Sequence, residues 1–181
     1  MNTLEGKHIL SCPDSYVCVD LETTGLNPCS DRIIEIGAVK VLHHVITAQF
    51  QSLINPGFRI SSFISGLTGI TNEMLTKAPP VSQVFPEFLS FIGDLPLVGH
   101  NIHCFDIKFL RMASLQLMQE PLSNNYFDTL YMARRLYPAE RHNRLQDLIV
   151  RFGIADLEEH RALSDALQTV ACYDFMRKAE F

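Results

Sequence analysis

The sequence predicts an α/β fold in which helices pack against one mixed sheet of five strands. Two observations lead to this prediction. Three β-favouring runs follow one another in the first part of the chain, at 16–21, 33–42 and 45–54. After them, short apolar runs alternate with segments of helical periodicity, as in a parallel β–α arrangement. No repeat, low-complexity tract or linker divides the 181 residues, so we expect a single domain over 1–181 with its core at about 14–178.

The first three strands are expected to pair in antiparallel fashion. The run YVCVDL is short and apolar enough to be a strand buried on both faces. A stretch rich in turn-forming residues follows it, with Gly25 and Pro28 as breakers. The next two runs are joined tightly at His43-His44, which indicates a hairpin.

The middle of the chain is expected to be a loop followed by two helices. The segment 55–71 is loop-like, and Thr71 is placed to cap a short helix that ends at Lys77. Residues 81–92 space their apolar side chains for one helical face. Pro86 argues against an uninterrupted helix there unless it falls in the first turn.

Strands and helices then alternate to the end of the chain. The expected order is strand, helix, strand passing into a helix, and two final helices, at 96–100, 102–118, 126–130, 144–152 and 161–178. Gly153 is the expected stop between the last two helices. We expect the two short strands to lie parallel in the sheet.

Composition narrows the class of protein. With 47% hydrophobic and 19% charged residues, the chain is typical of a soluble globular domain. No run approaches the ~20 apolar residues of a membrane helix, and no signal peptide is visible. Five cysteines without a C-x-x-C pair indicate free thiols in a reducing, cytoplasmic compartment. A net charge of −5 weighs against coating long nucleic acid by electrostatics alone.

Two acidic residues in VDLETTGL carry the strongest chemical signal. Asp20 and Glu22 are two apart in a strand, so both side chains point to the same face, with Cα atoms roughly 7 Å apart. Two like charges at that separation repel by about 2–3 kcal/mol at an effective dielectric of 20. A bridging cation would compensate them, and grouped carboxylate oxygens suit Mg²⁺ or Mn²⁺. The alternative is that Glu22 only marks the exposed end of the strand.

Two further segments carry acidic residues at helix starts. Asp106 in GHNIHCFDIKFL lies in the first turn of a predicted helix, where the dipole favours an acidic side chain, and Asn101 is a candidate N-cap. His160 and Asp165 in HRALSDA bracket the start of the final helix. The ordinary histidine pKa near 6.5 suits a general base. Taken one at a time, each of these residues has a structural explanation as well.

The three segments, in this order, closely resemble the DEDDh exonucleases, the family of the proofreading ε subunit of DNA polymerase III. The resemblance runs from Tyr16 to about Tyr173 and includes RIIEIGAV, LTGIT and FDTL. It implies an RNase H-like fold. It also implies hydrolysis of phosphodiester bonds from the 3′ end of a single strand, with release of nucleoside monophosphates.

The same resemblance implies a set of site residues. It assigns two divalent ions, Mg²⁺ or Mn²⁺, to four carboxylates and the role of general base to a histidine. The acidic ligands correspond to Asp20, Glu22, Asp106 and Asp165, and the base to His160.

The resemblance also implies contacts with the substrate. Thr23, Gly25 and Leu26 match positions beside the 3′-terminal nucleotide, with Gly25 permitting a close backbone approach. Ile70 matches a loop that touches the terminal bases, and we count Asn101 among the substrate-binding residues. For Leu26 and Ile70, ordinary packing is the alternative.

A basic stretch precedes the histidine segment and has two interpretations. It could follow the phosphates of a nucleic acid, or it could be a solvated helix end. Its residues are Arg134, Arg135, Arg141, His142 and Arg144.

Other functions stay open within and beyond this family. ETTG is more like the DNA proofreading branch than the oligoribonucleotide branch, so single-stranded DNA is favoured over RNA as substrate. A non-catalytic nucleic-acid-binding or assembly module predicts the loss of a ligand or of the histidine, and neither is missing. The chain ends at Phe181, directly after the final helix, so we expect a stand-alone exonuclease or a domain of a larger polymerase or helicase.

Overall fold

Five strands form one sheet in the computed structural model, which describes residues 5–180, and their order is β3-β2-β1-β4-β5. The strands are β1 (Tyr16–Thr23), β2 (Ile33–Leu42), β3 (Val45–Leu53), β4 (Leu97–Gly99) and β5 (Tyr126–Asp128). Strand β2 pairs antiparallel with β1 and β3, whereas β4 pairs parallel with β1 and β5. The predicted mixed sheet is therefore confirmed.

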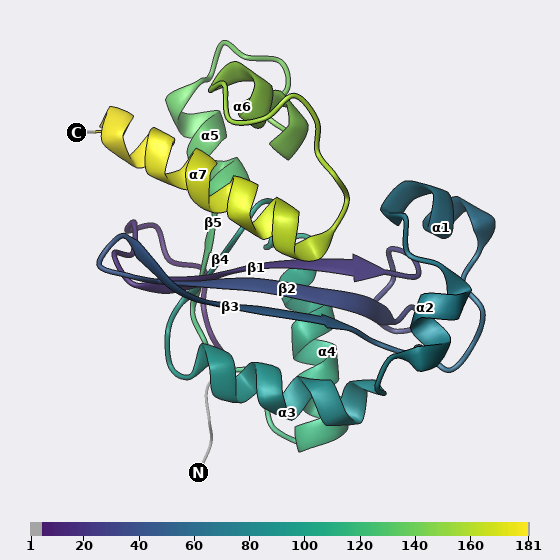
Figure 1. Ribbon diagram of the computed structural model, residues 1–181. Coiled ribbons are helices and arrows are strands. Elements are labelled where there is room, and N and C mark those ends of the chain that lie inside the picture. The colour runs from purple at the N-terminus through teal and green to yellow at the C-terminus, as the bar shows by residue number, and fades with distance from the viewer. Residues whose placement is uncertain (1–4, 181) are drawn as a thin grey trace.

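Helices cover both faces of this sheet (Figure 1). Helices α3 (Val81–Ile92) and α4 (Asp106–Met118) lie on one face. Helices α5 (Thr129–Leu136), α6 (Leu145–Arg151) and α7 (Ala162–Glu180) lie on the other, with α7 packed over β1 and β2. This layering buries both faces of β1 and β2, whereas most residues of the edge strand β3 are exposed.

The side chains of β1 alternate between these two layers. Val17, Val19 and Leu21 pack in the core under α3 and α4, whereas Tyr16 and Cys18 pack in the core under α5, α6 and α7. Because side chains two apart share a face, the row that begins with Tyr16 and Cys18 continues toward α7. The next members of that row are the two acidic residues of the strand.

The expectation of a loop over 55–71 is wrong for its second part. Residues Ser62–Thr68 form helix α1, and a further helix, α2, spans Asn72–Lys77. Ser61 caps α1 by accepting a hydrogen bond from the Ile64 backbone N–H at 3.2 Å, and Gly69 ends it in the left-handed conformation. Ile64 anchors the helix in a small core cluster. The predicted cap at Thr71 is confirmed, since its hydroxyl accepts from the Met74 N–H at 3.2 Å.

Helix α3 runs through Pro86 without a break, which corrects the expectation of an interruption. Proline removes the hydrogen bond to the carbonyl four residues earlier, here that of Ser82. Ser82 and Pro86 are both exposed, so water can hydrate that carbonyl. The opposite side of the helix buries Val84, Phe85 and Phe88, and this packing holds the helix together across the proline.

Helix α4 begins at Asp106, later than the predicted start at 102, so Asp106 does lie in the first turn. The proposed cap at Asn101 is wrong, because the N-cap position is Phe105. Asn101 instead adopts a left-handed conformation with φ 61°. Its backbone N–H donates to Asp128 Oδ1 at 3.1 Å, and the His103 N–H donates to Asp128 Oδ2 at the same distance.

The remaining elements agree with expectation in place and type. Gly153, with φ 66°, follows helix α6 as predicted. All five cysteines lie in the described part of the chain, and none of them forms a disulfide there. Among residues 5–180, none of the helices has the length and apolar character needed to cross a membrane.

Candidate active site

Four acidic residues from three elements gather around the end of β1. Asp20 and Glu22 belong to the β1 row that faces α7, Asp106 opens α4, and Asp165 lies in the first turn of α7. Carboxylate oxygens of Asp20, Glu22 and Asp165 all lie within 4.8 Å of one another. Asp106 is outside that close group but near enough for its charge to raise the pKa of Asp20, after the larger effect of burial. The structure thus brings together the four carboxylates that sequence analysis singled out.

Helix α7 reaches the site because β2 carries a glycine beneath its first turn. Gly37 pairs with Asp20 across the sheet. A Cβ atom at Gly37 would lie 2.1 Å from the Ala162 carbonyl carbon and 2.2 Å from the Leu163 nitrogen. Only a residue without a side chain therefore lets the α7 backbone rest on the sheet at this level. That close approach carries Asp165 to Asp20.

A buried ion pair fixes the segment just before α7. Glu35 pairs with Glu22 across the sheet and is fully buried. Its carboxylate accepts hydrogen bonds from Arg161 Nε and Nη2 at 3.1 and 2.8 Å, and from the Ala162 backbone N–H at 3.1 Å. Gln51 Nε2 donates a further bond at 2.9 Å. Burial raises the pKa of Glu35, but these hydrogen bonds outweigh it and leave that pKa below its usual value.

The four gathered carboxylates differ from Glu35 because their charges are not neutralised in this way. Burial, together with neighbouring acidic groups, holds the pKa of Asp20 well above its usual value and raises the pKa of Glu22 to about 8. Burial likewise raises the pKa of Asp106 and of Asp165 to about 7. Asp106 Oδ1 and Asp165 Oδ1 are buried without a hydrogen-bond partner in the described structure.

Such a group fits divalent cations. Buried carboxylate oxygens without donors are costly unless a positive charge compensates them, and hard oxygen ligands of this kind suit Mg²⁺ or Mn²⁺. The residues present are therefore able to hold divalent metal.

His160 stands directly before α7 in the strained left-handed conformation, with φ 51°. Its side chain is 41% exposed, and its Nδ1 lies 3.7 Å from Glu158 Oε1. Ligand atoms of Glu158, His160 and Asp165 also lie within 4.8 Å of one another. Sequence analysis did not select Glu158, although a glutamate two residues before a candidate base was a visible signal.

Two of the predicted substrate residues are held by contacts within the loop after β1. The Thr23 hydroxyl donates to the Gly25 carbonyl at 2.6 Å. A Cβ atom at Gly25 would lie 2.5 Å from Asp31 Oδ2, so the group that closely approaches this glycine belongs to the chain itself. Asp31 in turn accepts from the Asn27 backbone N–H at 2.9 Å. Gly25 therefore has a structural reason to lack a side chain.

An apolar cavity of about 460 Å³ opens beside Glu22. Leu26 projects into solvent at its edge with 84% of its side chain exposed. Helix α1 contributes Phe63 and Leu67, which are 75% and 44% exposed. These two residues were not predicted as site residues, because a loop was expected over 55–71 where the structure has α1.

Ile70 and Asn101 lie outside the residues that line this cavity. Ile70 is fully buried in the cluster that holds α1 and α2, so ordinary packing replaces the expected contact with terminal bases. The Asn101 backbone is committed to Asp128. The structure thus favours the packing alternative for Ile70, and the substrate role of the partly exposed Asn101 stays a prediction.

Within the basic stretch, the structure pairs Arg144 with an acidic residue. Arg134 and Arg135 end helix α5. Arg144 donates to Asp147 through Nε and Nη2 at 3.0 and 3.1 Å, at the start of α6. At Arg144 the structure thus shows a helix-terminal ion pair.

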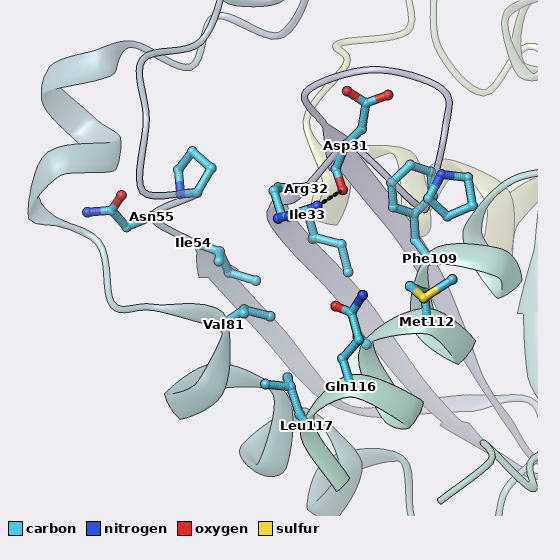
Figure 2. Close-up of a pocket in the computed structure, with 13 residues that line it drawn as sticks. Asp31, Arg32, Ile33, Ile54, Asn55, Val81, Phe109, Met112, Gln116 and Leu117 are labelled. Atoms are coloured by element: carbon cyan, nitrogen blue, oxygen red, sulfur yellow. Dashed lines mark hydrogen bonds between the residues drawn. The ribbon is translucent and has the colours of Figure 1, made fainter. Parts of the chain in front are cut away.

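A second cavity, of about 140 Å³, is lined by residues of α3 and α4 and of the segments 28–33 and 54–56 (Figure 2). Its walls are mainly apolar and include Ile33, Ile54 and Phe109. Its ionisable lining residues are Asp31 and Arg32, and Figure 2 shows the Asp31 carboxylate directed away from the cavity. This cavity gathers no set of groups suited to catalysis.

Comparison with known proteins bears on this site. The family model described as "Exonuclease" matches residues 17–173. The PolC-type DNA polymerase III of Pediococcus pentosaceus is 40% identical over 173 residues, which cover 93% of this chain and 12% of that polymerase. The ε subunit of DNA polymerase III from Aquifex aeolicus is 37% identical over 159 residues, 88% of this chain and 78% of that subunit. The chain thus spans about one eighth of the PolC-type polymerases it matches.

Solved structures agree in fold. Exonuclease X in complex with 5′ overhanging duplex DNA superposes with a TM-score of 0.73 and 26% identity, covering 92% of this chain and 93% of that one. An E. coli ExoI–ssDNA complex in its zinc ion bound form has a TM-score of 0.78 at 19% identity, over 92% and 41% of the two chains. These likenesses confirm the RNase H-like fold. Taken with the family match and the ε subunit, they show that the chain belongs to the DnaQ-like 3′–5′ exonuclease family.

Proposed function

We propose that this chain is a single exonuclease domain that hydrolyses single-stranded DNA from the 3′ end and releases nucleoside 5′-monophosphates. The observation that carries the proposal is the group of four unneutralised carboxylates with a partly exposed histidine at the end of β1. We place the activity in proofreading or repair beside a DNA polymerase or helicase, in the cytoplasm. The names of the polymerase relatives support this setting.

Each carboxylate has a role in this proposal. Asp20, Glu22, Asp106 and Asp165 hold two divalent ions, Mg²⁺ or Mn²⁺. When bound, such ions polarise the scissile phosphate and promote ionisation of the attacking water. His160 accepts the proton of that water, and its exposure leaves the imidazole open to solvent and substrate. The Glu35–Arg161 ion pair positions His160, because Arg161 follows it directly.

The apolar cavity beside Glu22 would receive the terminal nucleoside. The exposed ring of Phe63 offers a surface on which a base can stack, and Leu26 and Leu67 complete the apolar wall. Base stacking on aromatic side chains tolerates any sequence and requires an unpaired base. This geometry favours a single-stranded end. Thr23 and Gly25 also line this cavity, and they would lie beside the same nucleotide.

The test uses matched DNA and RNA oligonucleotides, each labelled at the 5′ end. With Mg²⁺ or Mn²⁺ we expect the DNA to shorten stepwise from its 3′ end and EDTA to stop the reaction. Asp20→Ala is the inactive control, and we expect RNA to be degraded more slowly. A DNA oligonucleotide left intact in the presence of Mn²⁺ would refute the hydrolase. Faster degradation of RNA would favour the exoribonuclease alternative.

Replacing His160 by Ala is expected to lower turnover by about 10²–10⁴-fold, the usual contribution of a general base. Mn²⁺ binding should persist, because the four carboxylates remain. Calorimetric titration with Mn²⁺ and single-turnover kinetics measure the two quantities separately. His43→Ala, at an exposed histidine in the tight connection between β2 and β3, is the matched control. If metal binding and turnover fall together, His160 is a ligand or a structural residue.

A further inference from the structure

Glu158 is a fifth carboxylate at the site, beyond the four of the proposed exonuclease centre. It lies two residues before His160, and its backbone N–H donates to Gln146 Oε1 at 2.7 Å, which fixes the loop that carries both residues. Its side chain is 21% exposed and turns toward the His160 imidazole. Together with Asp165 it completes a three-residue group whose donor atoms lie within 4.8 Å of one another.

The donor atoms of this group do not satisfy one another. The 3.7 Å separation of Glu158 Oε1 and His160 Nδ1 is too long for a direct hydrogen bond. Asp165 is 2% exposed, and its Oδ1 has no partner among the described residues. A buried acceptor of this kind calls for a donor or a cation.

The chemistry of the three ligands differs from that of the four-carboxylate group. One imidazole nitrogen and two carboxylate oxygens suit borderline metals such as Zn²⁺, whereas Mg²⁺ prefers oxygen alone. Zinc–ligand bonds of about 2.0–2.2 Å in a tetrahedron place the donor atoms roughly 3.4 Å apart. The 3.7 Å between Glu158 Oε1 and His160 Nδ1 is already close to that spacing. The 41% exposure of His160 leaves a fourth position open to water.

We propose that Glu158, His160 and Asp165 form a second site, for one zinc-class ion, that overlaps the catalytic group at His160 and Asp165, and that its occupation inhibits the exonuclease. The inhibitory part rests on the proposed function. His160 cannot accept a proton while its lone pair is bound to metal, and Asp165 is shared with the group of Asp20 and Glu22. One ion at this site would therefore disable the base and disturb the catalytic ligands at once.

Zinc binding is tested first, without reference to activity. The full chain is titrated calorimetrically with Zn²⁺ in saturating Mg²⁺, as wild type, Glu158→Gln and Glu159→Gln. Glu159 is the neighbouring exposed carboxylate and gives the same change of charge outside the ligand group. We expect Glu158→Gln to weaken the tightest zinc site by about tenfold or more, and Glu159→Gln to leave its affinity within twofold. Equal affinity in all three proteins would overturn the site, and thermal melts verify that each variant is folded.

Inhibition is then measured as the ratio of activity with and without micromolar Zn²⁺ within each protein. We expect strong inhibition of the wild type and of Glu159→Gln, and at least tenfold higher zinc concentrations for the same inhibition of Glu158→Gln. If Glu158→Gln loses Mg²⁺-dependent activity but binds and responds to zinc as the wild type does, Glu158 only orients His160 and the proposal is wrong. If no protein degrades DNA, the proposed function fails, and the calorimetry still decides the zinc site.

Discussion

Asp165→Asn is expected to lower exonuclease activity by about 10³-fold and yet to stabilise the metal-free protein above neutral pH. The loss of activity follows because Asp165 belongs to the oxygen group of Asp20 and Glu22, and metal stabilisation of a transition state is worth several kcal/mol. The gain in stability follows because Asn has nearly the same shape and removes a buried charge whose Oδ1 has no partner.

The raised pKa values of these carboxyl groups determine how the stability of the metal-free protein changes with pH. Burial and neighbouring acids raise the pKa of Asp106 and Asp165 to about 7 and that of Glu22 to about 8, whereas unfolded carboxyls titrate near pH ~4. Between those values the folded state binds more protons than the unfolded state. The free energy of unfolding of the apoprotein therefore falls as pH rises from about 4 to about 8. Bound Mg²⁺ or Mn²⁺ opposes the fall because it binds only the folded state.

Melting temperatures in EDTA at pH 5 and pH 8 measure this prediction. We expect the melting temperature of the wild type to be lower at pH 8 than at pH 5. The decrease should be smaller for Asp165→Asn. Added Mn²⁺ should raise the melting temperature at pH 8 mainly in the wild type. Asp156→Asn, an exposed carboxylate in the same connection, is the control and should behave as the wild type. A wild type that becomes more stable toward pH 8 without metal would contradict the raised pKa values.

Gly37→Ala is the second change with a large expected effect. The new Cβ would meet the Ala162 carbonyl carbon at 2.1 Å, and backbone cannot rotate away as a flexible side chain does. Helix α7 must then lift from β2 and carry His160 and Asp165 with it. We expect destabilisation of about 1–3 kcal/mol and a loss of activity of about 10²-fold, the usual result of a displacement of 1 Å at a reacting centre.

Denaturant unfolding and single-turnover kinetics test the two parts of this prediction. Gly66→Ala is the matched control, because Gly66 lies within α1 and a Cβ there meets no atom within 4 Å. That control should be stabilised by about 0.5–1 kcal/mol. Near-normal activity in Gly37→Ala would show that α7 does not depend on this close approach.

Local patterns predicted the parts of the fold that depend on neighbouring residues. The alternation of side chains along β1 predicted Asp20 and Glu22 on one face. The structure agrees, because successive residues of β1 pack alternately into the two core layers. Helix α1 was missed because a helix of seven residues has little periodicity, and its capping by Ser61 and the burial of Ile64 stabilise it instead. The exposed Phe63 was hidden by the same error.

The supports of the site were less accessible to sequence reasoning. Glu35 and Arg161 are 126 residues apart in the sequence, and no local pattern in either segment predicts that the two side chains form an ion pair. A charged residue inside the apolar run IIEIGAV was the available signal, because such a residue is rarely buried unless it is paired. No sequence pattern marked Gly37 as important. Its role, to let the α7 backbone approach β2 closely, depends on the contact between the helix and the sheet.

The packing of α7 against Gly37 also determines when the site can be completed during synthesis of the chain. Strands β1 and β2 can pair early, but the paired strands lack Asp165 and the His160 loop until the last helix has been made and docked. The ion pair between Glu35 and Arg161, which are 126 residues apart, can form only when α7 docks. A partly synthesised chain therefore holds Asp20 and Glu22 without Asp165, and the proposed metal site is complete only after α7 has docked.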